Sequence, residues 1–176
     1  MLKLLRRIGH EQGGLAAVEF ALILPAMLVL VFGAIEVTNV LIVKSDTTKL
    51  TSTAADLIAQ ESTVSNADMT NVLNSLNALI YPYPSVPAKI VITSVIDDGK
   101  GGGKVAWSDT KNGTARTVGS TVTVPTGLIT SGGSVIMSEV TYTYTSPAAY
   151  MVKIPVTMTN VFYSHPRRVA QIARTP

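Results

Sequence analysis

Gly14-Leu15-Ala16-Ala17-Val18-Glu19-Phe20 opens the longest apolar segment of the chain, which continues with few interruptions to Val43. Its most apolar part is about 20 residues long, which is enough to cross the core of a bilayer as a helix. The carboxylate of Glu19 lies five residues past Gly14. An acid at the centre of a membrane helix costs on the order of 2.5–3.5 kcal/mol, and less near an interface, so this residue needs a function.

The composition fits one ordinary domain joined to a membrane segment. The chain has 176 residues, of which only 14% are charged, and its mean hydropathy is +0.35. Because it has no cysteine, disulfides, thiolate metal sites and thiol catalysis are excluded. The first fourteen residues hold three of the 14 bases and one of the 11 acids, which leaves 11 bases against 10 acids elsewhere. Without a clustered basic face, we expect no nucleic-acid partner.

Three kinds of N-terminal segment could carry such a run. A cleaved secretory signal has a shorter apolar core, with its small residues after the core rather than before it. A plain signal anchor and a prepilin leader both remain, and in the second the cut precedes the helix. Lys3, Arg6 and Arg7 lie upstream, so the positive-inside rule places this end in the cytoplasm and the remainder of the chain outside.

Glu19 distinguishes the two remaining interpretations. Cleavage after Gly14 would give Leu15 a new amino group, and Glu19 would lie one helical turn away, at i+4. The amine and the carboxylate could pair within one chain or between neighbours, and an apolar medium strengthens that pairing. In a plain anchor the acid gains nothing unless it reaches the headgroups.

The run from Gly13 to Pro25, with Phe32-Gly33-Ala34-Ile35-Glu36 after it, resembles the N-terminus of TadE/TadG-type minor pilins (pseudopilins) of tight-adherence (Tad/Flp) pilus systems. The resemblance implies cleavage between Gly14 and Leu15 by a prepilin peptidase and an assembly role for Glu19 and Phe20. It also implies that the partners are other pilin subunits and inner-membrane assembly proteins. Major pilins of these systems have almost nothing after the helix, so a sizeable outer domain favours the minor class. The moderate length leans toward TadE rather than TadG.

Two helix-weakening residues, Pro25 and Gly33, lie within the apolar run. They could give the helix flexibility when it leaves the membrane for a filament. Ordinary membrane-helix composition explains them equally well, because neighbouring helices satisfy the freed backbone groups.

Beyond the span, the sequence predicts helices and then strands. A stripe of Leu50, Ala54, Leu57 and Ile58 extends the first helix in amphipathic form. Ser65-Asn66-Ala67-Asp68 has the form of a helix-start box for a second helix, which must end before Pro82. The predicted organisation is a leader (1–14), a first helix (15–64, with 15–43 transmembrane), a second helix with a proline-rich connector (65–87) and a β-rich outer domain (88–176).

From residue 89 the apolar period changes to two. Residues 89–96 and 104–108 are expected to form a hairpin, 109–113 a loop, and 117–124, 134–145 and 151–158 three more strands. Pro155 argues for an edge or a bulge in the last strand. The predicted fold class is α+β, with a long N-terminal helix packed on an antiparallel sheet in a pilin-like architecture.

No arrangement typical of an enzyme emerges from the sequence. Residues 99–105 imitate a phosphate-binding loop, but their spacing is one residue short and a strand follows instead of a helix. His165 has no acid nearby, His10 would be lost with the leader, and Asp97-Asp98 lacks the ligand spacing of a calcium loop. We expect no catalytic residue, metal or cofactor, and solvated charges at Arg167, Arg168 and Arg174.

The leading functional hypothesis is therefore a structural minor pilin that primes a Tad-type pilus or is built into it. The alternative is a single-pass membrane protein whose outer β-rich domain binds a partner without polymerising.

Overall fold

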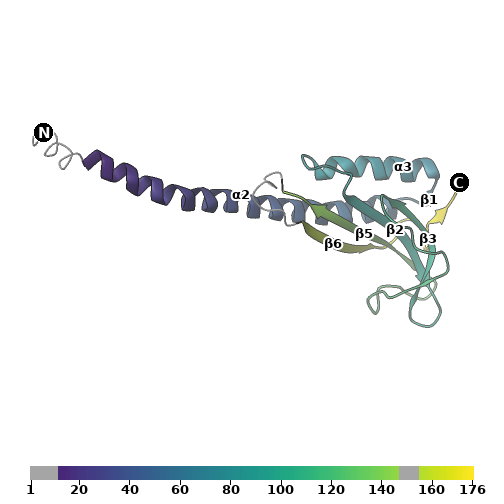
Figure 1. The fold of residues 1–176 in the computed structure, drawn as a ribbon. Coiled ribbons are helices and arrows are strands. Elements are labelled where there is room, and N and C mark those ends of the chain that lie inside the picture. The colour runs from purple at the N-terminus through teal and green to yellow at the C-terminus, as the bar shows by residue number, and fades with distance from the viewer. Residues whose placement is uncertain (1–11, 147–154) are drawn as a thin grey trace, which may run out of the picture. The chain divides into compact units, whose positions relative to one another are not determined.

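A computed structural model of the protein describes residues 12–146 and 155–176 (Figure 1). The basic residues of the leader and His10 lie outside this range. The chain divides into two compact units, of which the first ends at Asn39 and the second is Val40–Pro176. Helices are followed by an antiparallel sheet, which confirms the predicted α+β class.

The first helix, α2, runs from Gln12 to Ala59. It ends five residues before the predicted boundary at 64. The Ala59 carbonyl accepts a hydrogen bond from the backbone N–H of Arg167 (2.8 Å), and the next residues leave the helical path. Thr63–Val64 forms a short strand, β1, that pairs in parallel with β7 (Ala173–Arg174). A contact with the C-terminal tail, which local sequence cannot reveal, thus ends the helix early.

The predicted helix-start box is confirmed at the start of α3 (Asn66–Ser75). The backbone N–H of Asp68 donates to the Ser65 hydroxyl (3.2 Å), and the Ser65 N–H donates back to the Asp68 carboxylate (2.9 Å). Bonds from the Ser65 hydroxyl and N–H lower the pKa of Asp68. A 3-10 turn, η1 (Leu76–Ile80), continues the helix and ends before Pro82, as predicted.

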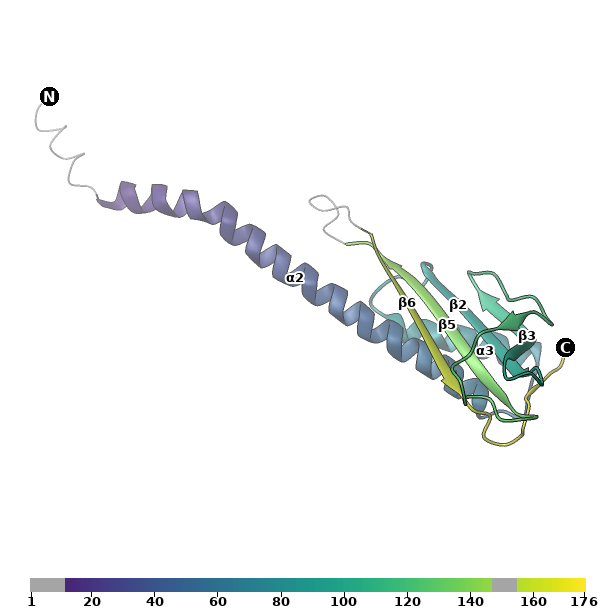
Figure 2. The same ribbon diagram turned by 90° about the horizontal axis from the view of Figure 1, so that it is seen from below.

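Five strands form the main sheet, in the order β4-β3-β2-β5-β6 with antiparallel neighbours. Figure 2 shows β2, β5 and β6 side by side. The strands are β2 (Ala88–Asp97), β3 (Gly103–Lys111), β4 (Thr121–Val122), β5 (Ser134–Tyr144) and β6 (Val156–Ser164).

The strand boundaries differ from the predicted ones in three places. Residues 109–111, expected in a loop, continue β3 because they pair with 90–92 of β2. The strand predicted over 117–124 is reduced to the two residues of β4. β6 begins directly after Pro155 and lies at the edge of the sheet, as predicted. It extends six residues beyond Met158, where the prediction ended, and residues 151–154 lie outside the described range.

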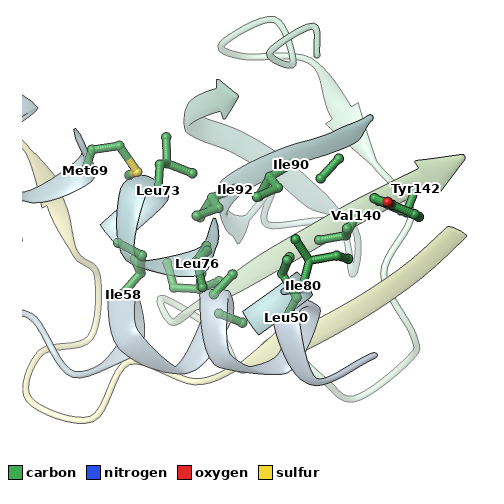
Figure 3. Close-up of a cluster of buried hydrophobic side chains, with 14 of the residues drawn as sticks. Leu50, Ile58, Met69, Leu73, Leu76, Ile80, Ile90, Ile92, Val140 and Tyr142 are labelled. Carbon is green, nitrogen blue, oxygen red and sulfur yellow. The ribbon is translucent and has the colours of Figure 1, made fainter. Parts of the chain in front are cut away.

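The main core of the second unit lies between the sheet and the helices α2, α3 and η1 (Figure 3). The predicted stripe on α2 contributes to it, with Leu50, Ala54 and Ile58 buried and Leu57 partly buried. On β5, Tyr142 and Tyr144 are buried on the same side of the strand, while Thr141 and Thr143, which alternate with them, are only partly buried. The apolar period of two predicted from residue 89 onward therefore holds in this part of β5.

Candidate functional site

The N-terminal part of α2 presents apolar side chains that no described residue covers. Leu15, Phe20, Leu22 and Leu30 are among the exposed large hydrophobic residues, and the most apolar window has a hydropathy of 2.5 with none of it buried. By length and composition, α2 is a candidate membrane span. An exposed apolar surface of this kind is typical of a segment that lies in a bilayer or against another protein.

The predicted assembly residues lie on the first described turns of this helix. Leu15 and Glu19 are four residues apart in a continuous α-helix, which places them on one face about 6 Å apart along the axis. Phe20 is 58% exposed and adjoins Glu19 on the helix surface. The geometry can therefore support a bond between an amine on Leu15 and the Glu19 carboxylate.

The glycines of the segment leave open space beside the helix. A Cβ built on Gly14 or on Gly33 would meet nothing within 4 Å. Neither residue is therefore required by packing within the described chain. Pro25 is contained within α2, which continues through it to Ala59.

The bond between Gly14 and Leu15 lies within α2. Glycine weakens a helix by about 1 kcal/mol relative to alanine, so Gly13 and Gly14 weaken α2 on the N-terminal side of this bond.

Residues 14–56 match the sequence model of the family described as TadE-like protein. The chain carries a TadE-like domain. This confirms the resemblance over the helix that contains Gly14, Glu19 and Pro25, and it supports an association with a Tad pilus system. Comparison with curated proteins and with solved structures found no match.

The second unit contains the sequence features that resemble phosphate-binding, catalytic or metal sites. The phosphate-loop lookalike is the turn between β2 and β3, in which the Asp98 carboxylate accepts the N–H groups of Lys100 (2.7 Å) and Gly102 (2.8 Å). These bonds lower the pKa of Asp98. The His165 ring nitrogen Nε2 lies 2.7 Å from the Leu128 carbonyl oxygen. Among the described residues, no three side chains are grouped to hold a metal ion.

Two of the three C-terminal arginines, expected to be solvated, instead bond within the chain. Arg174 makes two bonds to the Asp109 carboxylate (2.8 and 3.1 Å) and one to the Asn66 side chain (2.6 Å). The bond to Asp109 raises the pKa of Arg174. Arg167 pairs with Asp56 of α2, while Arg168 remains exposed. The expectation was wrong for Arg174, whose side chain is only 18% exposed because its partners, distant in sequence, cover it; Arg167 is ion-paired but remains 57% exposed.

One further ion pair lies on the sheet face opposite the helices. Arg116 donates two hydrogen bonds to Glu139, both of 2.7 Å, and this pairing raises the pKa of the arginine. The two residues line a shallow hollow of about 270 Å³ together with Thr141 and Thr159. The two charges of the pair satisfy each other, and the hollow is a polar surface that Lys89 also lines.

Proposed function

We propose that this protein is a minor pilin or pseudopilin that is cut after Gly14 and then primes a Tad-type pilus or is incorporated into it for surface attachment. The observation that carries the proposal is the exposed apolar helix with an acid, Glu19, one turn after Leu15. The TadE-like match over 14–56 supports it independently.

In this proposal the bacterial inner membrane stores the subunit before assembly. The N-terminus faces the cytoplasm, where a prepilin peptidase removes residues 1–14, and the unit Val40–Pro176 lies outside. The exposed apolar residues of α2 first contact lipid and then contact other pilin subunits in the filament. Inner-membrane assembly proteins are the further partners.

Glu19 has the role of a register signal. Cleavage creates an amine on Leu15, and the pairing of that amine with Glu19 in the same or a neighbouring chain neutralises an acid that is costly in an apolar medium. When the pair forms between neighbouring chains, a subunit displaced along its neighbour would leave the acid unpaired. The charge therefore favours one axial position among many apolar contacts that would otherwise be similar.

A glutamine substitution separates this role from packing. In its own host, Glu19→Gln should reach the membrane and be cleaved normally but should be depleted from sheared pili about tenfold or more, since a loss of 1.4 kcal/mol changes an equilibrium tenfold. The matched control is Glu36→Gln, which removes an acid from the other end of the apolar run. Wild-type amounts of the Glu19→Gln protein in pili, or equal depletion of both variants, would remove the function assigned to Glu19.

A further inference from the structure

The apolar segment does not end before the second unit but inside it. Val43 is fully buried in the core and Val40 packs against it, whereas Leu41 is 60% exposed and Ile42 44% exposed. Lys44 is the first charged residue after them. One helical turn therefore contributes both to the folded core and to the uncovered apolar surface, so no spacer separates the two.

This turn belongs to one end of the second unit. The Arg167 N–H donates to the Ala59 carbonyl, so the end of α2 lies close to the residues that follow β6. Because β5 and β6 are antiparallel, the end of β6 lies beside the beginning of β5. From Ala59 back to Val40 the helix is about 28 Å long, and β5 is about 34 Å long. In Figure 3, Leu50 lies nearer than Ile58 to Tyr142, which belongs to the later part of β5. The residues 40–43 are therefore level with the last residues of β5.

The loop 81–87 lies at this same end and presents apolar side chains. Tyr81 and Val86 are each 80% exposed. The loop is held in place by the Tyr142 hydroxyl, which donates to the Pro84 carbonyl (3.0 Å). Tyr83 also packs edge-on against Tyr144, with their ring centroids 5.8 Å apart. Both tyrosines line a small apolar cavity together with the prolines of the loop. Because the loop is already ordered, contact through its exposed side chains requires little additional ordering.

We propose that this end of the second unit rests on the surface of the bilayer that holds its own apolar helix. The contact surface, here called the membrane-proximal rim, consists of Leu41 and Ile42 on α2 and Tyr81 and Val86 on the loop. Tyrosine favours the headgroup region because its ring is apolar and its hydroxyl is polar. Lys44 lies next to the rim and suits anionic headgroups. The rim keeps the second unit against the membrane until the subunit is extracted.

This inference rests on the membrane anchorage of the proposed function, so its test must measure both. The chain has no cysteine, and single cysteines can therefore carry a fluorescent label. Val86→Cys reports on the rim. Val118→Cys is the matched control, since Val118 is 66% exposed and lies at the opposite end of the unit. Its neighbour Gly119 donates its N–H to the Val105 carbonyl on β3, and Val105 pairs with β2 where β2 pairs with the first residues of β5. Leu30→Cys reports on the span.

The full chain would be reconstituted in vesicles of phosphatidylethanolamine and phosphatidylglycerol that contain lipids spin-labelled at the headgroup or at the chain centre. We expect the headgroup label to at least halve the emission at Val86→Cys and to leave that at Val118→Cys unchanged, because the two ends lie about 34 Å apart. Adding Tyr81→Ser to Val86→Cys should at least halve the quenching. The emission of Trp107 checks that each variant is folded.

Each other outcome has one meaning. Quenching of Leu30→Cys by the chain-centre label, with equal and low quenching at Val86→Cys and Val118→Cys, would overturn the rim contact while leaving the anchorage intact. No quenching of Leu30→Cys would contradict the anchorage itself. Emission at Val86→Cys that depends on the protein-to-lipid ratio in vesicles without spin-labelled lipid would assign the rim to a second copy of the chain and would also overturn the proposal.

Discussion

We expect the hydrogen bonds of Arg174 to contribute strongly to the stability of the second unit. The guanidinium contacts both oxygens of Asp109, the side chain of Asn66 and the carbonyl oxygens of Val64 and Thr175. It thereby joins the C-terminal strand to β1, to the start of α3 and to β3. Replacing Arg174 with alanine removes all of these bonds at once, while the backbone pairing of β1 with β7 can remain.

The size of the effect follows from charge and burial. The Arg174 and Asp109 side chains are 18% and 26% exposed, so water screens the pair only in part. Hydrogen bonds to charged groups contribute about 1.5–3 kcal/mol each, whereas an exposed ion pair contributes about 0–1 kcal/mol. We therefore expect Arg174→Ala to cost about 3 kcal/mol, Asp109→Ala about 2 kcal/mol, and their coupling in a double-mutant cycle to be about 1.5 kcal/mol.

The assay uses the one tryptophan of the chain. Trp107 is 7% exposed, and its indole N–H donates to the Ile172 carbonyl (2.8 Å), two residues before Arg174. Urea unfolding of the full chain in mild detergent, followed by Trp107 emission, therefore reports on the second unit. Arg168→Ala is the control, because Arg168 is exposed and should change stability by less than about 0.5 kcal/mol. A coupling energy below about 0.5 kcal/mol, or equal losses for Arg168→Ala and Arg174→Ala, would refute this reasoning.

Two further predictions use the same unfolding assay. Leu50→Ala should lower the free energy of unfolding by about 2–5 kcal/mol, because Leu50 is fully buried between α2 and the sheet. Leu41→Ala, at a 60% exposed position, should lower it far less, and equal losses would contradict the packing described. The lowered pKa of Asp68 means that its bonds to Ser65 stabilise the fold above the unfolded-state pKa of about 3.9 and are lost as the pH falls through the folded value. Asp68→Asn should therefore have a lower urea midpoint than the wild type at pH 7, and the difference should shrink below about pH 4; a constant difference would argue against the titration of this cap.

Features governed by neighbouring residues could be predicted from the sequence. The helix-start box at Ser65, the turn after Asp97 and the buried side of β5 all depend on contacts within a few residues or on a repeat of two. The apolar helix with Glu19 was likewise visible, and the TadE-like match covers it. Local chemistry is sufficient for such elements.

Features that depend on the C-terminal tail could not be predicted. Arg167 lies 111 residues from Asp56, and Arg174 lies 65 residues from Asp109. Nothing in the local sequence pairs one charge with another at such distances. The early end of α2 and the short strand β1 follow from the same tail, as β7 is the partner of Thr63–Val64 among the described strands. The level of the loop 81–87 relative to the end of the apolar segment also required the three-dimensional packing.

The central claim is that the apolar helix starts at a new terminus. The most direct measurement is the N-terminal residue of the protein purified from the membranes and pili of its own host, by intact mass and N-terminal sequencing. The proposed function predicts a chain that starts at Leu15, with its free amine available to Glu19. A chain that retains Met1, or one cut after the apolar segment, would contradict it.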